Sequence, residues 1–337
     1  SSLSAEKLSR CLSEHPQARL LVLSCPSYEG VLSDLESLVS LAHQRGLKVL
    51  VDAAHGAHLG FGTFFPGGAV KSGADIVIQS LHKTLPSLTQ TAIAHAGSEE
   101  AASLLEEQLD LFQTSSPSYL LMASIDGCVR LLEERGDELF EAWHERLGRF
   151  CREARGLQRF TIFGLNGLPG GVFGHDPSKI LIGCARSGMS GYRLLHTLRE
   201  GYGIDLEMAG HRSALAMTGM GDAEDALSRL VMALKDIEQN TAPGELLPDD
   251  ALPRAEAVLS PGEALERCHE LIPMEAAAGR VCAEYVTAYP PGIPLLVPGE
   301  AITVRIVTAA GRGESLMKSK SKGKGGQIVV LKAVSEL

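Results

Sequence analysis

Four residues at the ends of two apolar segments have types and spacing that could do chemistry together. Lys83 stands just after the apolar run "ADIVIQ", with Ser80 and His82 before it in "SLHKTLPSLTQTAIAH". Asp52 closes an earlier apolar run, "KVLVD". A lysine at the end of a buried strand can be a reactive amine, because burial and nearby positive charge favour its neutral form. The alternative is a lysine that simply ends its strand in solvent.

These residue types match what pyridoxal 5'-phosphate requires of a protein. The cofactor acts as an electron sink when a carboxylate keeps its pyridine nitrogen protonated, and Asp52 is the candidate carboxylate. Its phosphate needs hydroxyl and imidazole donors near the lysine, and Ser80 and His82 flank Lys83. A strand-end Asp followed by Ser-x-His-Lys therefore predicts a pyridoxal phosphate site, whereas either half alone would be weak evidence. The alternative role of Asp52 is to cap a turn or a helix.

Other polar patterns in the chain give weaker indications. The two histidines of "HGAH", His55 and His58, invite a metal interpretation, but without clear further ligands they are weak evidence, and we expect no metal. We interpret His58 and His95 as packing or hydrogen-bonding residues. The glycine-rich "GLPGGVFG" does not join a strand to a helix, so we interpret it as a turn and not as a phosphate loop.

The elements that must position these residues alternate along the opening third of the chain. "ARLLVLS", "KVLVDAAHGAH" and "GADIVIQS" read as buried strands, and "TAIAHAG" as a possible fourth. Between the first two, Ser33 and Glu36 form a predicted capping box of a helix that ends near Gly46. Short apolar strands separated by helices predict an α/β domain with a parallel sheet. Ligands bind at the C-terminal ends of such strands, where Asp52 and Lys83 both stand.

The sequence after the opening third predicts a long helix, a small α/β layer, a C-terminal unit and a basic tail. A long helix is expected from about residue 119 to 154, followed by a small β-α-β-β-α layer. A proline-rich break over 241–261 separates this layer from a C-terminal unit, in which the prolines of "YPPGIPLLVPGE" prevent a regular central strand. The segment "KSKSKGKGG" (318–326) reads as a solvated, disordered basic tail.

The composition excludes several classes of protein. The chain has 337 residues, of which 45% are hydrophobic and 21% charged, ordinary values for a soluble globular protein. No apolar run approaches the ~20 residues that cross a bilayer. A formal net charge of −10 argues against a nucleic-acid surface and is compatible with a cationic substrate. The seven cysteines are scattered without metal-type spacing, which indicates free thiols in a reducing compartment.

Several segments, in this order, resemble the bacterial-type ornithine/lysine/arginine decarboxylases, which are fold-type I pyridoxal phosphate enzymes. They are "LVDAAHGAHLGF", "GADIVIQSLHKTLPSLTQTAIAH" and "LFQTSSPSYLLMASID", followed by "DPSKILI" and "GRVCAEYVTAYPPGIPLLVPGE". The resemblance covers about residues 17 to 305. It is strongest to the shorter arginine/lysine decarboxylase branch, which lacks the large N-terminal wing domain.

The resemblance implies a role for each candidate site residue. Lys83 would hold the cofactor covalently, Asp52 would pair with its pyridine nitrogen, and Ser80 and His82 would hold its phosphate. His55 would lie by the phenolic oxygen of the cofactor or by the substrate.

The resemblance also implies a dimer and a reaction. Thr114 and Ser115 match a segment that approaches the cofactor of the neighbouring subunit, so a homodimer is expected. The reaction would be decarboxylation of arginine, lysine or ornithine to the corresponding amine of polyamine biosynthesis, with no nucleic-acid or membrane partner. Glu207, Glu284 and Glu300 are candidates for the carboxylate that meets the distal cation of the substrate, and the sequence does not choose among them.

The chain departs from the family pattern at its beginning. No segment before Asp52 resembles the family's phosphate-binding loop, so we expect the chain to begin inside the cofactor domain. The expected parts are the C-terminal part of the cofactor domain (1–118), a linking helix with a small α/β domain (119–240), the decarboxylase C-terminal domain (241–310) and a basic tail (311–337). A cytoplasmic location is expected, or an organellar one if a targeting segment preceded the chain.

Two other functions stay open at this point. The first is another fold-type I activity, such as that of an aminotransferase or a cysteine desulfurase, which also use an Asp followed by a later Lys. The second is a truncated, non-catalytic homologue that dimerises with a full-length relative or regulates it.

Overall fold

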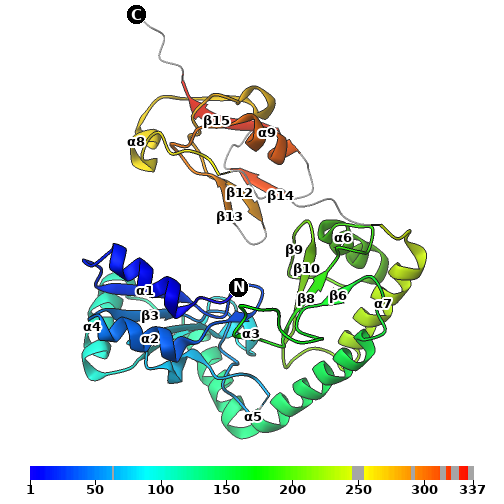
Figure 1. Cartoon of the computed structure of the whole chain (residues 1–337). Coiled ribbons are helices and arrows are strands. Elements are labelled where there is room, and N and C mark those ends of the chain that lie inside the picture. The colour runs from blue at the N-terminus through cyan, green and yellow to red at the C-terminus, as the bar shows by residue number, and fades with distance from the viewer. Residues whose placement is uncertain (63, 245–253, 290–292, 312–315, 320–325, 333–337) are drawn as a thin grey trace, which may run out of the picture. The chain divides into compact units, whose positions relative to one another are not determined.

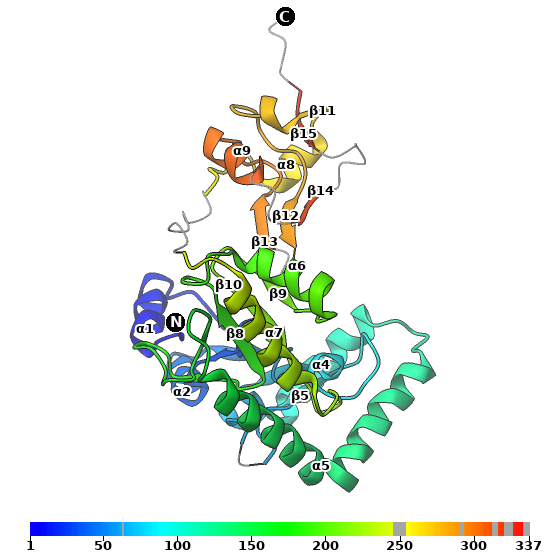
Figure 2. The same ribbon diagram turned by 90° about the vertical axis from the view of Figure 1, so that its right-hand side faces the viewer.

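The computed structural model describes the chain in two compact units, shown in two views in Figures 1 and 2. It describes all residues except 63, 245–253, 290–292, 312–315, 320–325 and 333–337. The first unit comprises Ser1–Ile182 and Leu215–Asn240, and the second comprises Gly183–Ala214 and Thr241–Leu337. Every predicted cofactor-site residue lies in the first unit.

The first sheet of this unit carries the candidate site. Its strand order is β1 (Leu20–Ser24), β3 (Lys48–Asp52), β4 (Ile76–Ser80) and β5 (Ala92–Ala96). Strands β1, β3 and β4 are parallel, as expected, with Ser24 opposite Asp52 and Asp52 opposite Ile78. The valines Val49, Val51 and Val77 are buried in this sheet, where branched apolar side chains pack well. The register places the ends of β3 and β4 at the same edge.

Strand β5 runs antiparallel to β4, which differs from the parallel order expected. The connection between the two strands contains only the short helix α3 (Leu81–Thr84) and a turn. A parallel neighbour would need a crossover of a dozen or more residues, so this connection can only return the chain as an antiparallel strand.

Helix α2 (Leu35–Gln44) begins one residue later than its predicted capping box. Its N-cap is Asp34, whose Oδ1 accepts a hydrogen bond from the backbone N–H of Ser37 at 3.1 Å. A carboxylate at this position also interacts favourably with the helix dipole. Ser33 instead accepts a hydrogen bond from the backbone of Leu3, so the predicted box is wrong. The predicted apolar face is confirmed as buried: Leu35, Leu38, Val39 and Ala42.

Helices α4 (Glu99–Phe112) and α5 (Tyr119–Ala154) follow, and α5 confirms the predicted long helix. Helix α5 packs against α7 (Ala226–Asn240) and buries Trp143, whose indole N–H donates to Thr218 at 3.0 Å. The remaining helix of this unit is α1 (Ala5–Glu14), which packs against α2.

A second four-stranded sheet has the order β6 (Thr161–Ile162), β8 (Lys179–Gly183), β10 (Ser213–Met217) and β9 (Met208–Ala209). With α6 (Gly191–Tyr202) and α7, these elements confirm the predicted β-α-β-β-α order. A two-stranded antiparallel pair joins β2 (Val31–Leu32) to β7 (Gly174–His175). This pair brings the segment that enters β8 beside the loop that follows β1.

The C-terminal part of the second unit has its own apolar core. Its elements are α8 (Pro261–Glu266), β11 (His269–Pro273), β12 (Val286–Tyr289), β13 (Ile293–Leu296), α9 (Val304–Gly311), β14 (Leu316–Ser319) and β15 (Gln327–Leu331). Ile302, Ile306, Ile328 and Val330 are buried together there. Strand β13 lies at an edge, in the order β13-β12-β14, which is where a sheet tolerates proline.

The segment interpreted as a disordered basic tail differs from that expectation at its first residues. Lys318 and Ser319 belong to β14, which pairs with β12. Residues 320–325 lie outside the described part of the chain. Strand β15, which follows, pairs with β11.

Among the residues that the structure describes, no helix is long and apolar enough to cross a membrane.

Candidate active site

The C-terminal edge of the first sheet holds the predicted lysine and aspartate. Asp52 is the last residue of β3, and its Oδ1 accepts a hydrogen bond from the backbone N–H of Ala54 at 3.0 Å. Ser80 ends β4, and the chain passes directly into α3, which carries His82 and Lys83. The parallel register of β3 and β4 is therefore what positions these side chains at one edge.

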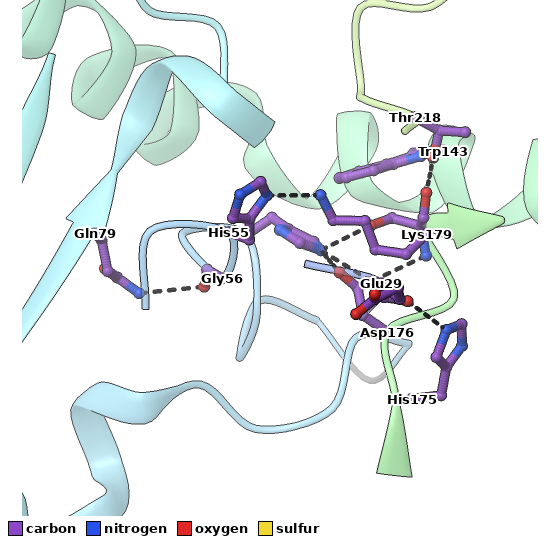
Figure 3. Close-up of polar contacts among 11 residues, drawn as sticks. Glu29, His55, Gly56, Gln79, Trp143, His175, Asp176, Lys179 and Thr218 are labelled. Atoms are coloured by element: carbon purple, nitrogen blue, oxygen red, sulfur yellow. Dashed lines mark hydrogen bonds and ion pairs between the residues drawn. The ribbon is translucent and has the colours of Figure 1, made fainter. Parts of the chain in front are cut away.

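Two lysines contact the imidazole ring of His55 from opposite sides. Nζ of Lys83 lies 3.2 Å from Nε2, and Nζ of Lys179 lies 2.9 Å from Nδ1. Figure 3 shows the Lys179 side chain pointing at the ring. The Tyr28 ring lies on another side, with centroids 4.6 Å apart and a tilt of 55°. Gln79 anchors the turn after β3, because its side-chain amide donates a hydrogen bond to the carbonyl oxygen of Gly56.

These surroundings keep His55 neutral. Burial of the ring, followed by the positive charges of Lys179 and Lys83, lowers the pKa of His55 from its ordinary value to about 3. The negative charge of Asp176 opposes this shift but is the weaker influence. At neutral pH the ring therefore has one N–H donor and one acceptor nitrogen.

Lys179 reaches the site from a tight turn with the sequence "DPSK". Its backbone N–H donates to the carbonyl of Asp176 at 3.1 Å, and its side chain is fully buried. Gly30, at φ +89°, makes room for this side chain, because a Cβ there would lie 2.6 Å from Cβ of Lys179. His175 secures the same loops by a hydrogen bond at 3.0 Å to the carbonyl of Glu29 (Figure 3).

A buried polar group supports that turn. His58 Nε2 lies 3.1 Å from Oδ1 of Asp176 and 3.1 Å from the hydroxyl of Ser178. Burial alone would raise the pKa of Asp176, but the charge of His58 and hydrogen bonds from His58 and Ser178 hold that pKa below its ordinary value. The interpretation of His58 as a hydrogen-bonding residue is confirmed. His95 is bonded likewise, to the side chain of Gln79 at 3.0 Å.

The two predicted phosphate donors, Ser80 and His82, differ in the hydrogen bonds that they already make. Ser80 is the N-cap of α3, but its side chain makes no capping bond. His82 Nδ1 lies 2.9 Å from the carbonyl oxygen of Thr91 and must carry a hydrogen, since a carbonyl only accepts. Thr114 and Ser115 are exposed between α4 and α5, and the hydrogen-bonded group around His55 does not include them within the described residues.

The carboxylates considered for the substrate cation all belong to the second unit. Glu284 is buried, and its Oε1 accepts a hydrogen bond from the backbone of Val329 at 2.7 Å. Glu300 accepts one from the backbone of Val297 at 2.8 Å. In the part of the chain that the structure describes, no cluster of three or more His, Cys, Asp or Glu side chains could hold a metal.

Sequence reasoning missed Lys179 and Asp176. Both stand in "DPSKILI", which carried part of the family resemblance but had no assigned role. A signal was present, because Lys179 directly precedes the apolar run "ILI", and a lysine that begins a buried strand must be exposed or paired. The pairing of β2 with β7 helps to bring this lysine to His55, and the local sequence does not reveal that pairing.

Two family models match the chain. One, described as the major domain of the Orn/Lys/Arg decarboxylases, matches residues 1–164, and the other, described as their C-terminal domain, matches residues 245–309. The chain belongs to the Orn/Lys/Arg decarboxylase family. An arginine decarboxylase of Bacillus subtilis is 34% identical over 311 residues, which are 89% of this chain and 63% of that protein. The chain thus spans less than two thirds of this relative.

Solved structures agree with the family on the fold. A lysine decarboxylase of Francisella novicida has a TM-score of 0.72 at 18% identity, over 98% of this chain and 60% of that one. An alanine–glyoxylate aminotransferase of Nostoc has a TM-score of 0.54 at 16% identity, over 70% of this chain and 66% of that one. The fold is therefore the fold-type I α/β fold that was expected from the resemblance.

Proposed function

We propose that the chain carries out pyridoxal phosphate-dependent decarboxylation of a basic amino acid. The observation that carries the proposal is the position of Lys83, whose amine contacts the neutral ring of His55 at the sheet edge where Asp52 ends β3. Membership of the Orn/Lys/Arg decarboxylase family supports the choice of reaction.

The donor set at this edge fits the cofactor. Asp52 binds the backbone through Oδ1, and Oδ2 stays outside that bond, so the carboxylate suits a pyridinium nitrogen. The Ser80 hydroxyl is not used to cap α3 and suits a phosphate oxygen. His82 uses its Nδ1–H on Thr91, so it donates to a phosphate from Nε2 only as the imidazolium.

Each residue has its own task around the bound cofactor. The cofactor supplies the electron sink for the pair left behind when carbon dioxide departs. Asp52 would keep a proton on the pyridine nitrogen of the cofactor, and Lys83 would be the residue that holds the cofactor. His55 lies 3.2 Å from Nζ of Lys83 through its Nε2 atom, and as a neutral ring it can orient that amine by one hydrogen bond.

A basic amino acid is the proposed substrate class. The Bacillus subtilis relative at 34% identity is an arginine decarboxylase, so arginine is the first substrate to assay, before lysine and ornithine. The formal charge of −10 favours the approach of a cation. The choice between Glu207, Glu284 and Glu300 as its partner stays a prediction, and Glu284 and Glu300 already accept backbone hydrogen bonds.

We also infer that the chain forms a homodimer through the junction of α4 and α5. Large apolar side chains are exposed on both sides of Thr114 and Ser115: Leu111, Phe112, Tyr119 and Leu120. Such a group of exposed apolar side chains marks an interaction surface. In a dimer formed there, Thr114 and Ser115 of each subunit would lie near the cofactor of the other subunit.

Release of labelled carbon dioxide tests the proposed reaction. The purified chain, supplied with pyridoxal phosphate, is offered carboxyl-labelled arginine, lysine and ornithine in turn. We expect release from at least one of them, lost by roughly a thousandfold or more in Lys83→Ala. Lys71→Ala, at an exposed lysine, is the matched control and should keep the rate. Transamination in place of release, or no turnover of any of the three, would contradict the proposal.

A further inference from the structure

Gln90 has a backbone conformation that glutamine rarely adopts. Its φ is +80°, and it is the only residue other than glycine with a positive φ in the described part of the chain. Such a conformation costs free energy, and proteins keep it mostly at functional sites. We propose that Gln90 binds the phosphate of the cofactor with its side-chain amide, and that this contact is the reason for its strained backbone. The proposal rests on the proposed function only for the presence of this cofactor.

The turn that holds Gln90 is fixed by its neighbours. Residues 88–91 form a turn in which the backbone N–H of Thr91 donates to the carbonyl of Leu88 at 3.2 Å. Gln90 is the third residue of this turn, where a positive φ favours glycine or asparagine. Thr91 is buried, and its hydroxyl donates to the same carbonyl at 2.8 Å. A change of Gln90 to a negative φ would disturb both hydrogen bonds, so the turn maintains the strain.

The same turn lies beside the predicted phosphate donors. The carbonyl oxygen of Thr91 accepts a hydrogen bond from Nδ1 of His82 at 2.9 Å. Ala92, the first residue of β5, pairs with Ser80, the last residue of β4. Because β5 runs antiparallel to β4, the start of β5 and the end of β4 share one edge of the sheet. Gln90 therefore stands at the edge that carries Ser80 and His82.

The side chain of Gln90 is available to a ligand. It is exposed, and it makes no hydrogen bond to any residue that the structure describes. Its amide offers two N–H donors and carries no charge, so it can donate without a change of protonation. Hydrogen bonds to a charged acceptor such as phosphate are stronger than those between neutral groups.

The two predicted phosphate donors leave acceptor sites on a phosphate unused. A phosphate group presents three strongly accepting oxygens. Ser80 offers one hydroxyl hydrogen. His82 already donates from Nδ1 to Thr91, so only its imidazolium form has a second hydrogen for the phosphate. Gln90 supplies further donors at neutral pH, from the turn that precedes β5.

The experiment compares two ligands that differ only in the phosphate. Equilibrium dialysis of the full chain gives the dissociation constants of pyridoxine 5'-phosphate and of pyridoxine, which have no aldehyde and form no bond with lysine. We expect the unmodified chain to prefer the phosphorylated ligand. Gln90→Gly should reduce this preference at least about tenfold, because it loses a hydrogen bond to a charged group, and should leave the affinity for pyridoxine unchanged.

Urea unfolding without ligand gives a second readout. Glycine adopts a positive φ without steric cost, so the urea midpoint of Gln90→Gly should be higher than that of the unmodified chain. Gln17→Gly is the control, at an exposed turn residue without a positive φ, and should neither raise the midpoint nor change the preference. Gln90→Arg keeps a long donating side chain and should retain the preference.

Two results would overturn the proposal. One is a Gln90→Gly chain that keeps the full preference for the phosphorylated ligand, which would mean that the strain serves packing alone. The other is an unmodified chain that binds both ligands equally. No turnover is measured, so a chain that shows the preference but does not decarboxylate would contradict the proposed function and leave the role of Gln90 standing.

Discussion

His55 makes the stability of the first unit sensitive to acid. Its pKa in the folded chain is about 3, below the ~6.5 of an unfolded histidine, so the unfolded state binds more protons between these values. The free energy of unfolding should therefore fall as the pH is lowered from about 6.5 toward 3. His95 and His175, whose pKa values are also lowered by burial, add to the fall in the same direction.

The substitution His55→Gln measures how much of this pH dependence of the free energy of unfolding comes from His55. Glutamine keeps one donor and one acceptor but does not titrate, so urea unfolding across pH 4 to 7 should show a shallower pH dependence. His15→Gln, at an exposed histidine after α1, should leave the slope unchanged. If the free energy of unfolding depended on pH equally in the unmodified chain and in His55→Gln, this would contradict a buried, neutral ring.

Individual site residues differed in how far the sequence could predict them. Asp52, Ser80, His82 and Lys83 were found because each follows an apolar strand, and parallel strands bring their ends to one edge. Their roles toward the cofactor stay predictions. Lys179 was not found as a site residue, because its place depends on a strand pair whose two halves lie far apart in the sequence.

At the scale of elements, the loop after β1 and the turn before β8 must fit together closely. Gly30→Ala places a Cβ at φ +89° and 2.6 Å from Cβ of Lys179, whereas Gly46→Ala has φ +76° with no atom within 4 Å. A left-handed backbone costs a non-glycine residue about 1–2 kcal/mol. Gly46→Ala should lose about that much stability in urea unfolding, and Gly30→Ala roughly 1–3 kcal/mol more. Equal losses would mean that Lys179 is not packed on Gly30.

Elements with a local cause were predicted well. The apolar period of α2 and the long helical pattern of α5 are confirmed, because side chains three and four residues apart share a helix face. The cap of α2 was placed one residue early, since Ser33 and Asp34 both suit an N-cap and only the structure shows that Ser33 bonds elsewhere. The direction of β5 and the place of β15 depend on tertiary pairing, which no local pattern contains.

At the scale of the whole molecule, the exposed apolar junction of α4 and α5 should govern assembly. Phe112, which is 83% exposed, is the strongest candidate for a contact with a second copy. Phe112→Ser should weaken the dimer at least tenfold in sedimentation equilibrium. Met232→Ser, at a side chain 69% exposed on α7, should leave the dissociation constant unchanged. A chain that is monomeric at every concentration, or two variants with the same effect, would contradict the proposed interface.

The most direct test of the account is to locate the lysine that binds the cofactor aldehyde. The chain is mixed with pyridoxal phosphate at a stoichiometric ratio, reduced with borohydride, digested and analysed by mass spectrometry. We predict one pyridoxyl-phosphate adduct per chain, on Lys83, and its loss in Asp52→Ala, which removes the carboxylate proposed to pair with the ring nitrogen. An adduct on Lys179, or label spread over exposed lysines with Lys83 unmodified, would contradict it.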